Sequence, residues 1–119
     1  MTTAFAFMLA MGNASAYVDH FLHGTILGTL SRSQADTFIR TFKEVLSDTP
    51  DGGKVSLQIP ADGRRAAIEG SLTLQRTKVE NGERCRQMRT EVKRGSQKEG
   101  WVGWFCKQAN GEWKAKRGR

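Results

Sequence analysis

The pattern of apolar and polar residues divides the chain into a helical first part and a strand-rich second part. Between residues 32 and 46, apolar residues recur at helical spacing while charged residues occupy the opposite face. Ser31 and Gln34 have the spacing of a capping box, which marks the start of a helix. The segment 48–53 (Asp-Thr-Pro-Asp-Gly-Gly) ends it. The pattern therefore predicts an amphipathic helix whose core-facing residues include Phe38, Ile39 and Phe42.

After residue 53 the apolar positions alternate with polar ones, as is typical of strands. Asn81-Gly82 and Gly95-Ser96 separate successive segments, because type I′ and II′ hairpin turns need residues that accept positive φ. Asn110-Gly111 is predicted to close a last hairpin. The five predicted strands are Lys54–Ile59, Ala67–Val79, Arg84–Lys93, Gly100–Lys107 and Glu112–Ala115. A helix followed by a small antiparallel meander places the fold in the α+β class.

Cys85 and Cys106 are the two cysteines of the chain, and we expect them to form a disulfide. A two-residue loop at Gly95-Ser96 places them directly opposite each other. Opposed strand residues lie about 4.5 to 5.5 Å apart, within the roughly 4.4 to 6.8 Å that a disulfide spans. The bridge would close about twenty residues and contribute about 3 kcal/mol. Because the spacing fits no zinc pattern, the pair favours an oxidising compartment.

The same register distributes apolar residues over both faces of the sheet. One face is predicted to carry Met88, Val92, Trp101 and Phe105. The other is predicted to carry Cys85, Cys106, Val102, Trp104 and Trp113. A single helix covers only one face, and we expect it on the Met88 side. The second face is then either covered by the N-terminal segment or presents its tryptophans to solvent and partners.

The N-terminal residues have the arrangement of a secretory signal peptide. Residues 1–16 combine an uncharged apolar run with small residues ending in Ala14-Ser15-Ala16. The run of about ten apolar residues is far short of the roughly 20 that span a bilayer. No Lys or Arg precedes it, so either the signal is incomplete or the segment is a buried helix. We expect residues 17–30 to be a short helical lead-in, 31–116 the α+β domain and 117–119 a basic tail.

The charge of the chain favours anionic partners. The formal net charge is +7 and the isoelectric point is near 9.9. We expect the basic end of the chain either to be a solvated terminus or to contact an anionic envelope surface such as lipid headgroups. The predicted interaction surface consists of Trp104, Trp113, Arg89, Lys107, Lys114, Lys116 and Arg117.

Catalytic and metal-binding patterns are missing from the sequence. It contains no Walker loop, no HExxH helix and no paired-carboxylate signature. His20 and His23 lie on one helical face, but two imidazoles fall short of the four ligands of a tetrahedral zinc site. We therefore expect neither an enzyme nor a cofactor, a metal or a specific small-molecule substrate.

Three groups of residues together have a familiar order: Cys85-Arg86-x-Met88-x-Thr90-x-Val92, then Gly103-x-x-Cys106-Lys107, then Asn110-Gly111-x-Trp113. They resemble the C-terminal domain of the bacterial seventeen-kilodalton surface antigen family, first known from rickettsiae, and the similarity extends over residues 28–115. The resemblance implies an exported bacterial protein of the periplasm, cell surface or outer membrane. The chain lacks that family's lipoprotein cysteine and long glycine zipper, so the resemblance does not imply lipid anchoring.

Two functional interpretations follow. The first is a non-enzymatic envelope or surface protein that serves interaction or scaffolding, for example as an accessory of an envelope machine, with an envelope protein or anionic surface as partner. The alternative is a small basic nucleic-acid-binding protein with tryptophans as stacking platforms. Its basic residues would be Arg64, Arg65, Arg86, Arg89, Lys93 and Arg94. A leader and a disulfide disfavour nucleic acid as the partner. The sequence does not identify the partner or the oligomeric state.

Overall fold

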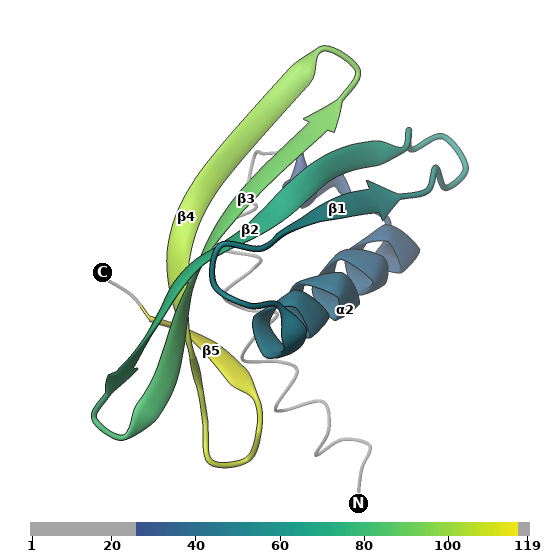
Figure 1. Ribbon diagram of the computed structural model, residues 1–119. Helices are drawn as coiled ribbons and strands as arrows, with labels where there is room; N and C mark the ends of the chain where they lie inside the picture. Colours follow the sequence, from purple (N-terminus) through teal and green to yellow (C-terminus); the bar gives the residue numbers. More distant parts are fainter. Residues whose placement is uncertain (1–25, 117–119) are drawn as a thin grey trace, which may run out of the picture.

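One helix lies against a single antiparallel sheet in the computed structural model, which describes residues 26–116 (Figure 1). The α+β class predicted from the sequence is confirmed. The predicted signal segment, His20, His23 and Arg117 lie outside the described residues.

Helix α2 extends over Arg32–Asp48, and its start is fixed by the predicted capping box. Ser31 Oγ accepts from the Gln34 backbone N–H at 3.1 Å, and Gln34 Oε1 accepts from the Ser31 N–H at 3.1 Å. These reciprocal bonds satisfy two amides that the first helical turn would otherwise leave without partners. The helix ends as predicted before the Pro-Asp-Gly-Gly segment, because Thr49 already has an extended backbone.

Five strands form one sheet in the order β1-β2-β3-β4-β5, so each strand pairs with its neighbours in sequence. Their bounds are Lys54–Ile59, Ile68–Glu80, Glu83–Arg94, Gln97–Lys107 and Trp113–Lys116. The sheet is the predicted meander. Strands β3 and β4 are longer than the alternation indicated, whereas β2 and β5 are each shifted by one residue toward the C-terminus. In Figure 1 the long β3–β4 hairpin extends well beyond the short β5.

The β2–β3 and β3–β4 hairpins have the predicted turn residues in the expected conformation. Asn81 and Gly82 have φ of 53° and 78°, as a type I′ turn requires, and Gly95 has φ of 62°. The β4–β5 hairpin differs because its loop contains five residues, with the Gln108 N–H donating to Glu112 O at 2.7 Å. A register shift between Leu74 and Arg76 adds a bulge in β2 opposite β3.

The main core lies between α2 and one face of the sheet, which we call the inner face. Phe42 of α2 meets Phe105 of β4 edge-on with ring centroids 4.9 Å apart. Phe38 is buried, whereas Ile39 and Phe42 are partly buried against the same core. Met88 and Val92 are buried in it, so the expectation that the helix covers the Met88 side is confirmed.

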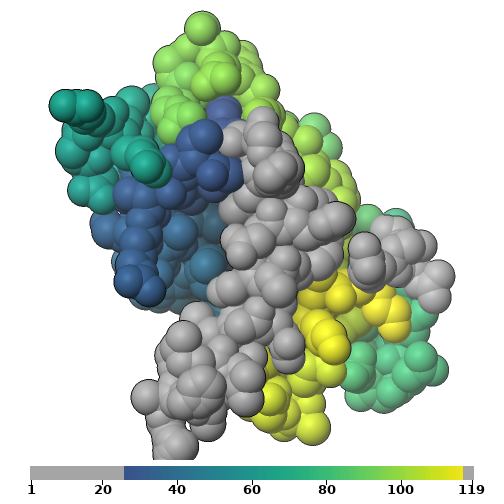
Figure 2. All heavy atoms as spheres, turned by 180° about the vertical axis from the view of Figure 1, so that it is seen from behind, coloured from purple at the N-terminus to yellow at the C-terminus, as the bar shows by residue number. Residues whose placement is uncertain are grey.

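The lead-in to the helix closes the far end of the inner face. Residues Leu27–Thr29 form a single 3-10 turn, and Ile26 and Leu27 are buried in the main core. The Ile26 N–H donates to Glu99 Oε1 at 2.7 Å, and Arg94 Nη2 donates to Thr29 Oγ1 at 2.6 Å. Figure 2 shows the purple and blue atoms of this segment beside the yellow-green tip of the β3–β4 hairpin. The described part of the lead-in thus extends the helical layer.

Candidate functional site

The residues predicted to form one interaction surface are distributed over both faces of the sheet. Trp104, Arg89, Lys114 and Lys116 share the face opposite α2, which we call the outer face. Trp113 and Lys107 pair with each other on the inner face. The predicted surface is therefore not a single patch.

Trp104 is a buried residue rather than an exposed platform. Only 7% of its surface is exposed, and it forms a small cluster with the two cysteines. Lys78 Nζ lies 4.4 Å and the Arg76 guanidinium 5.6 Å from the centre of the ring. Both distances are within the range of a cation–π contact, so the two cations cover the aromatic face. The expectation that this tryptophan faces solvent is wrong.

Trp113 lies on the opposite side of the sheet from its predicted position. It is 6% exposed within the main core, and its indole Nε1 donates to Ser47 Oγ of α2 at 3.2 Å. The five-residue loop pairs Trp113 with Lys107, which shifts β5 by one position relative to a two-residue loop. A shift of one residue exchanges the two faces of a strand. The predicted placement of Trp113 beside the cysteines is therefore wrong.

Arg86 is a buried side chain that links β3 to the C-terminal end of α2 through hydrogen bonds. Its side chain is buried, with 2% of the residue exposed, although it was among the basic residues of the nucleic-acid alternative. Nη1 donates to Leu46 O at 2.6 Å, and Nη2 donates to Thr49 O at 2.6 Å. The guanidinium thus satisfies carbonyls at the C-terminal end of α2, where a positive charge is favourable.

Thr77 and Asp51 complete the surroundings of the Arg86 guanidinium. Arg86 Nε donates to Thr77 Oγ1 at 2.9 Å, and the Thr77 hydroxyl donates to Asp51 Oδ1 at 2.5 Å. Arg86 Nη2 also lies 3.3 Å from Asp51 Oδ1. The Thr77 hydrogen bond lowers the pKa of Asp51; Arg86 acts in the same direction, while desolvation opposes both. This network holds the fold together and leaves Arg86 unavailable to a ligand.

The outer face carries its side chains in rows that cross the strands. One row consists of the short residues Ser56, Ser71 and Gly100 together with Glu91. The next row toward one end contains Lys93 and Lys98, and the next toward the other end contains Lys54 and Arg89. We call the short row and its two basic walls the transverse groove.

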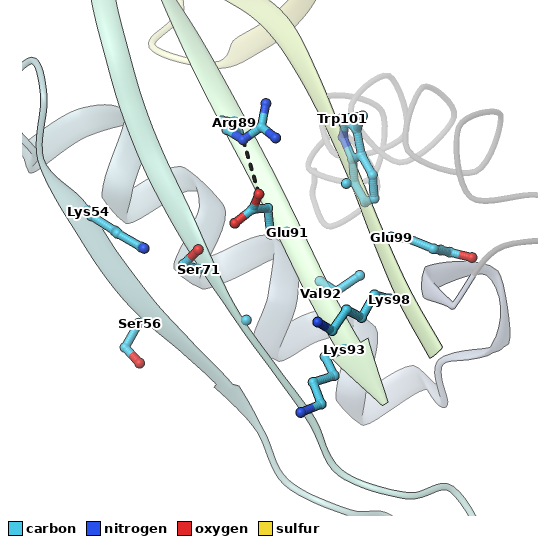
Figure 3. A pocket seen from close by; sticks show the side chains of 12 residues that line it. Lys54, Ser56, Ser71, Arg89, Glu91, Val92, Lys93, Lys98, Glu99 and Trp101 are labelled. Carbon is cyan, nitrogen blue, oxygen red and sulfur yellow. Dashed lines mark hydrogen bonds and ion pairs between the residues drawn. The ribbon is translucent and has the colours of Figure 1, made fainter. Parts of the chain in front are cut away.

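An open hollow of about 900 Å³ occupies the transverse groove. Figure 3 looks onto this hollow, with α2 behind the sheet and Lys54, Ser71 and Glu91 directed toward the viewer's side. Arg89 Nε donates to Glu91 Oε2 at 3.1 Å, and both side chains are about half exposed. The groove therefore combines serine hydroxyl groups, the Glu91 carboxylate that is paired with Arg89, and several ammonium groups. Of its members, sequence reasoning had selected Arg89 for the surface and Lys93 for the nucleic-acid alternative.

The disulfide predicted from the hairpin register is confirmed. Cys85 and Cys106 are directly opposed in the β3–β4 pair and are bonded, with Cα atoms 3.9 Å apart, somewhat closer than expected. Ligand atoms of Glu83 and both cysteines lie within 4.8 Å of one another. Because the sulfurs are joined, they offer no thiolate to a metal ion.

The chain matches no protein-family model, no curated protein and no solved structure at a significant level. Within residues 26–116, no helix is long and apolar enough to cross a membrane.

Proposed function

We propose that the chain is a non-enzymatic, exported domain of the bacterial envelope that uses the outer face of its sheet to bind an anionic envelope partner. The observation that carries the proposal is this face itself, which no described helix covers and on which basic side chains outnumber acidic ones. The basic residues of the face are Lys54, Arg76, Lys78, Arg89, Lys93, Lys98, Lys114 and Lys116. The acidic residues are Glu69, Glu80, Glu83 and Glu91.

The location outside the cytoplasm is supported by the disulfide and by the signal-like first residues. Disulfides persist in the periplasm and at cell surfaces, whereas cytosolic reductants keep most thiols reduced. The resemblance to the surface antigen family points to the same compartment. Arg86, Trp104 and Trp113 are buried, which removes a cation and two stacking platforms from the nucleic-acid alternative.

Cell fractionation tests the proposed location. The tagged protein should appear in the periplasmic or outer-membrane fraction, with a mature N-terminus near residue 17 and a mass two hydrogens below that of the reduced chain. A cytoplasmic protein with an intact Met1 and free thiols would overturn the proposal and favour the nucleic-acid alternative.

Co-sedimentation with isolated envelope fragments tests the proposed binding. The purified protein should bind at low ionic strength and dissociate as salt increases, because exposed charges are screened over about 8 Å at physiological salt. Charge reversal on the outer face, for example Lys93→Glu with Lys98→Glu, should abolish binding. Reversal at Arg32 and Arg40 on the exposed side of α2 is the control, and equal loss in both variants would contradict the assignment to the outer face.

A further inference from the structure

The transverse groove has the dimensions of a site for an elongated ligand. Its floor crosses from β1 to β4, which corresponds to about 14 Å at the usual strand spacing of about 4.8 Å. Its two walls stand four residues apart along the strands, or about 13 Å. The hollow of about 900 Å³ is open to solvent, so a longer chain could lie across the sheet and extend beyond it.

The floor of the groove is suited to hydroxyl groups. Ser56 and Ser71 are directly opposed in the β1–β2 pair, and each hydroxyl both donates and accepts hydrogen bonds. Glu91 is directly opposite Ser71 and offers a carboxylate that accepts only. Gly100 continues the row without a side chain, and the Glu91 side chain lies beside this position.

The walls of the groove favour an anion, because they contain the four basic residues Lys54, Arg89, Lys93 and Lys98 and one carboxylate, that of Glu69 directly opposite Lys93. Lys93 and Lys98 are directly opposed in the β3–β4 pair, an arrangement of like charges that destabilises a sheet. Within the described residues, neither of them nor Lys54 lies within ion-pair distance of a carboxylate. A negative group bound between the walls would relieve the repulsion between the two facing lysines.

Other classes of partner fit these residues less well. The centres of protein interfaces are depleted in Lys, Glu and Ser, which are the residue types that make up the groove. Single-stranded nucleic acid binds through stacking on exposed aromatic rings. Trp104 and Trp113 are buried, and Trp101, which borders the hollow, packs against the main core of the inner face.

We propose that the transverse groove binds a linear acidic polysaccharide whose sugar units carry carboxylates. The carboxylates lie between Lys54, Lys93 and Lys98, while the sugar hydroxyls contact Ser56, Ser71 and Glu91. Arg89 holds the Glu91 carboxylate in place through its hydrogen bond. This inference rests on the proposed function, because it names the chemistry of the anionic envelope partner.

Titration calorimetry with oligomers of galacturonate and of mannuronate tests the site. The wild-type chain should bind at least one of them, and binding should weaken with salt. The variant Lys93→Ala/Lys98→Ala should lose about tenfold or more in affinity, since each hydrogen bond to a charged group contributes about 1.5 kcal/mol or more. The control Arg32→Ala/Arg40→Ala removes the same charge from the exposed side of α2, away from the outer face, and should bind as the wild type does.

A second variant separates the groove from general electrostatics. Ser71→Val fills the floor without changing the charge, and a β-branched residue suits a strand. It should lower the affinity several-fold while leaving the unfolding midpoint unchanged. Unaltered binding by Ser71→Val, or equal weakening in the Arg32/Arg40 control, would show non-specific attraction and overturn the site.

Comparison ligands identify the class of partner. Neutral dextran, polyglutamate and a single-stranded oligonucleotide should all bind more weakly than the acidic oligosaccharides. If polyglutamate or the oligonucleotide binds as tightly, or if neither oligosaccharide binds, the inference is wrong. Salt-sensitive binding to envelope fragments would then still support the proposed function, whereas a cytoplasmic location would remove that function whatever the groove binds.

Discussion

Thr90 illustrates how a single polar atom affects the stability of this core. The residue is completely buried between Leu72 and Trp101 on the inner face, and its Oγ1 has no hydrogen-bond partner among residues 26–116. A buried hydroxyl without a partner costs about 1 to 3 kcal/mol relative to its hydrated state. Sequence alternation alone could not reveal this, since Thr is a common strand residue.

We expect Thr90→Val to stabilise the protein by about 1 kcal/mol, because valine has nearly the same shape and no unsatisfied hydroxyl. Urea unfolding at neutral pH measures the change. Thr77→Val is the matched control. It removes the hydroxyl that accepts from Arg86 and donates to Asp51, so it should destabilise by about 1 to 3 kcal/mol. Equal effects at the two positions would contradict the hydrogen-bond assignments.

Asp51 should make stability depend on pH in the acidic range. Its pKa is lower in the folded state, chiefly because the Thr77 hydroxyl donates to it. The unfolded chain therefore binds a proton at Asp51 more readily than the folded chain does. The ionised Asp51 stabilises the fold above about pH 4, and this contribution is lost as the pH falls through the lower pKa of the folded state. Wild type should therefore exceed Asp51→Asn in stability at pH 7, and the difference should shrink on acidification.

Urea midpoints measured between pH 7 and pH 2.5 test this assignment. Thr77→Val should also remove most of the pH dependence that separates wild type from Asp51→Asn, since Thr77 is its main cause. A difference that stays constant over the whole range would mean that the Asp51 charge is not involved.

At the level of elements, Gln34 connects two parts of the fold. Its Oε1 closes the capping box, and its Nε2 donates to Pro60 O at 3.0 Å and Ala66 O at 3.1 Å in the β1–β2 connection. The residue is only 1% exposed. The capping box was predictable from the spacing of Ser31 and Gln34, whereas the bonds to the distant loop were not.

Gln34→Glu separates the two roles of this side chain. The carboxylate still accepts from Ser31 but cannot donate, and it faces two carbonyl oxygens. We expect a loss of about 2 to 4 kcal/mol in the free energy of unfolding, measured in urea. Ser31→Ala, which removes only a capping bond, should cost about 1 kcal/mol. If both variants lose the same stability, the bonds to the loop contribute nothing.

The strands show which features of a sheet the sequence determines. Gly95-Ser96 fixed the register of β3 and β4 closely enough to pair Cys85 with Cys106, whereas the bulge between Leu74 and Arg76 in the β2–β3 pair had no signal in the alternation. Trp113 was misplaced because Asn110-Gly111 also fits a longer loop. In this five-residue loop the Glu112 backbone N–H donates a hydrogen bond to Asn110 Oδ1 at 3.0 Å. A register shift of one residue moves Trp113 from one face of the sheet to the other. The four residues of β5 are too few for their apolar pattern to decide between the two registers.

Over the whole molecule, the sequence predicted the layers better than the surface. The helix, the meander and the disulfide follow from periodicity and turns, which are local signals. The transverse groove follows from side chains on four strands that are far apart in sequence. Only the strand register places Ser56, Ser71 and Gly100 in one row. The net charge of the chain therefore suggested an anionic partner but did not indicate where that partner binds.

The disulfide should stabilise the molecule without being required for its fold. It closes a separation of 21 residues, for which chain entropy predicts about 3 kcal/mol. The bridge belongs to the small outer cluster with Trp104, whereas α2 packs on the separate main core.

The variant Cys85→Ala/Cys106→Ala should therefore keep the far-ultraviolet spectrum and the burial of Trp113. Its free energy of unfolding in urea should fall by about 3 kcal/mol, and Trp104 should become accessible to acrylamide quenching. Val102→Ala, an exposed change in the same hairpin, should do none of this. An unfolded double variant, or one as stable as wild type, would show that the two clusters are not separate in this way.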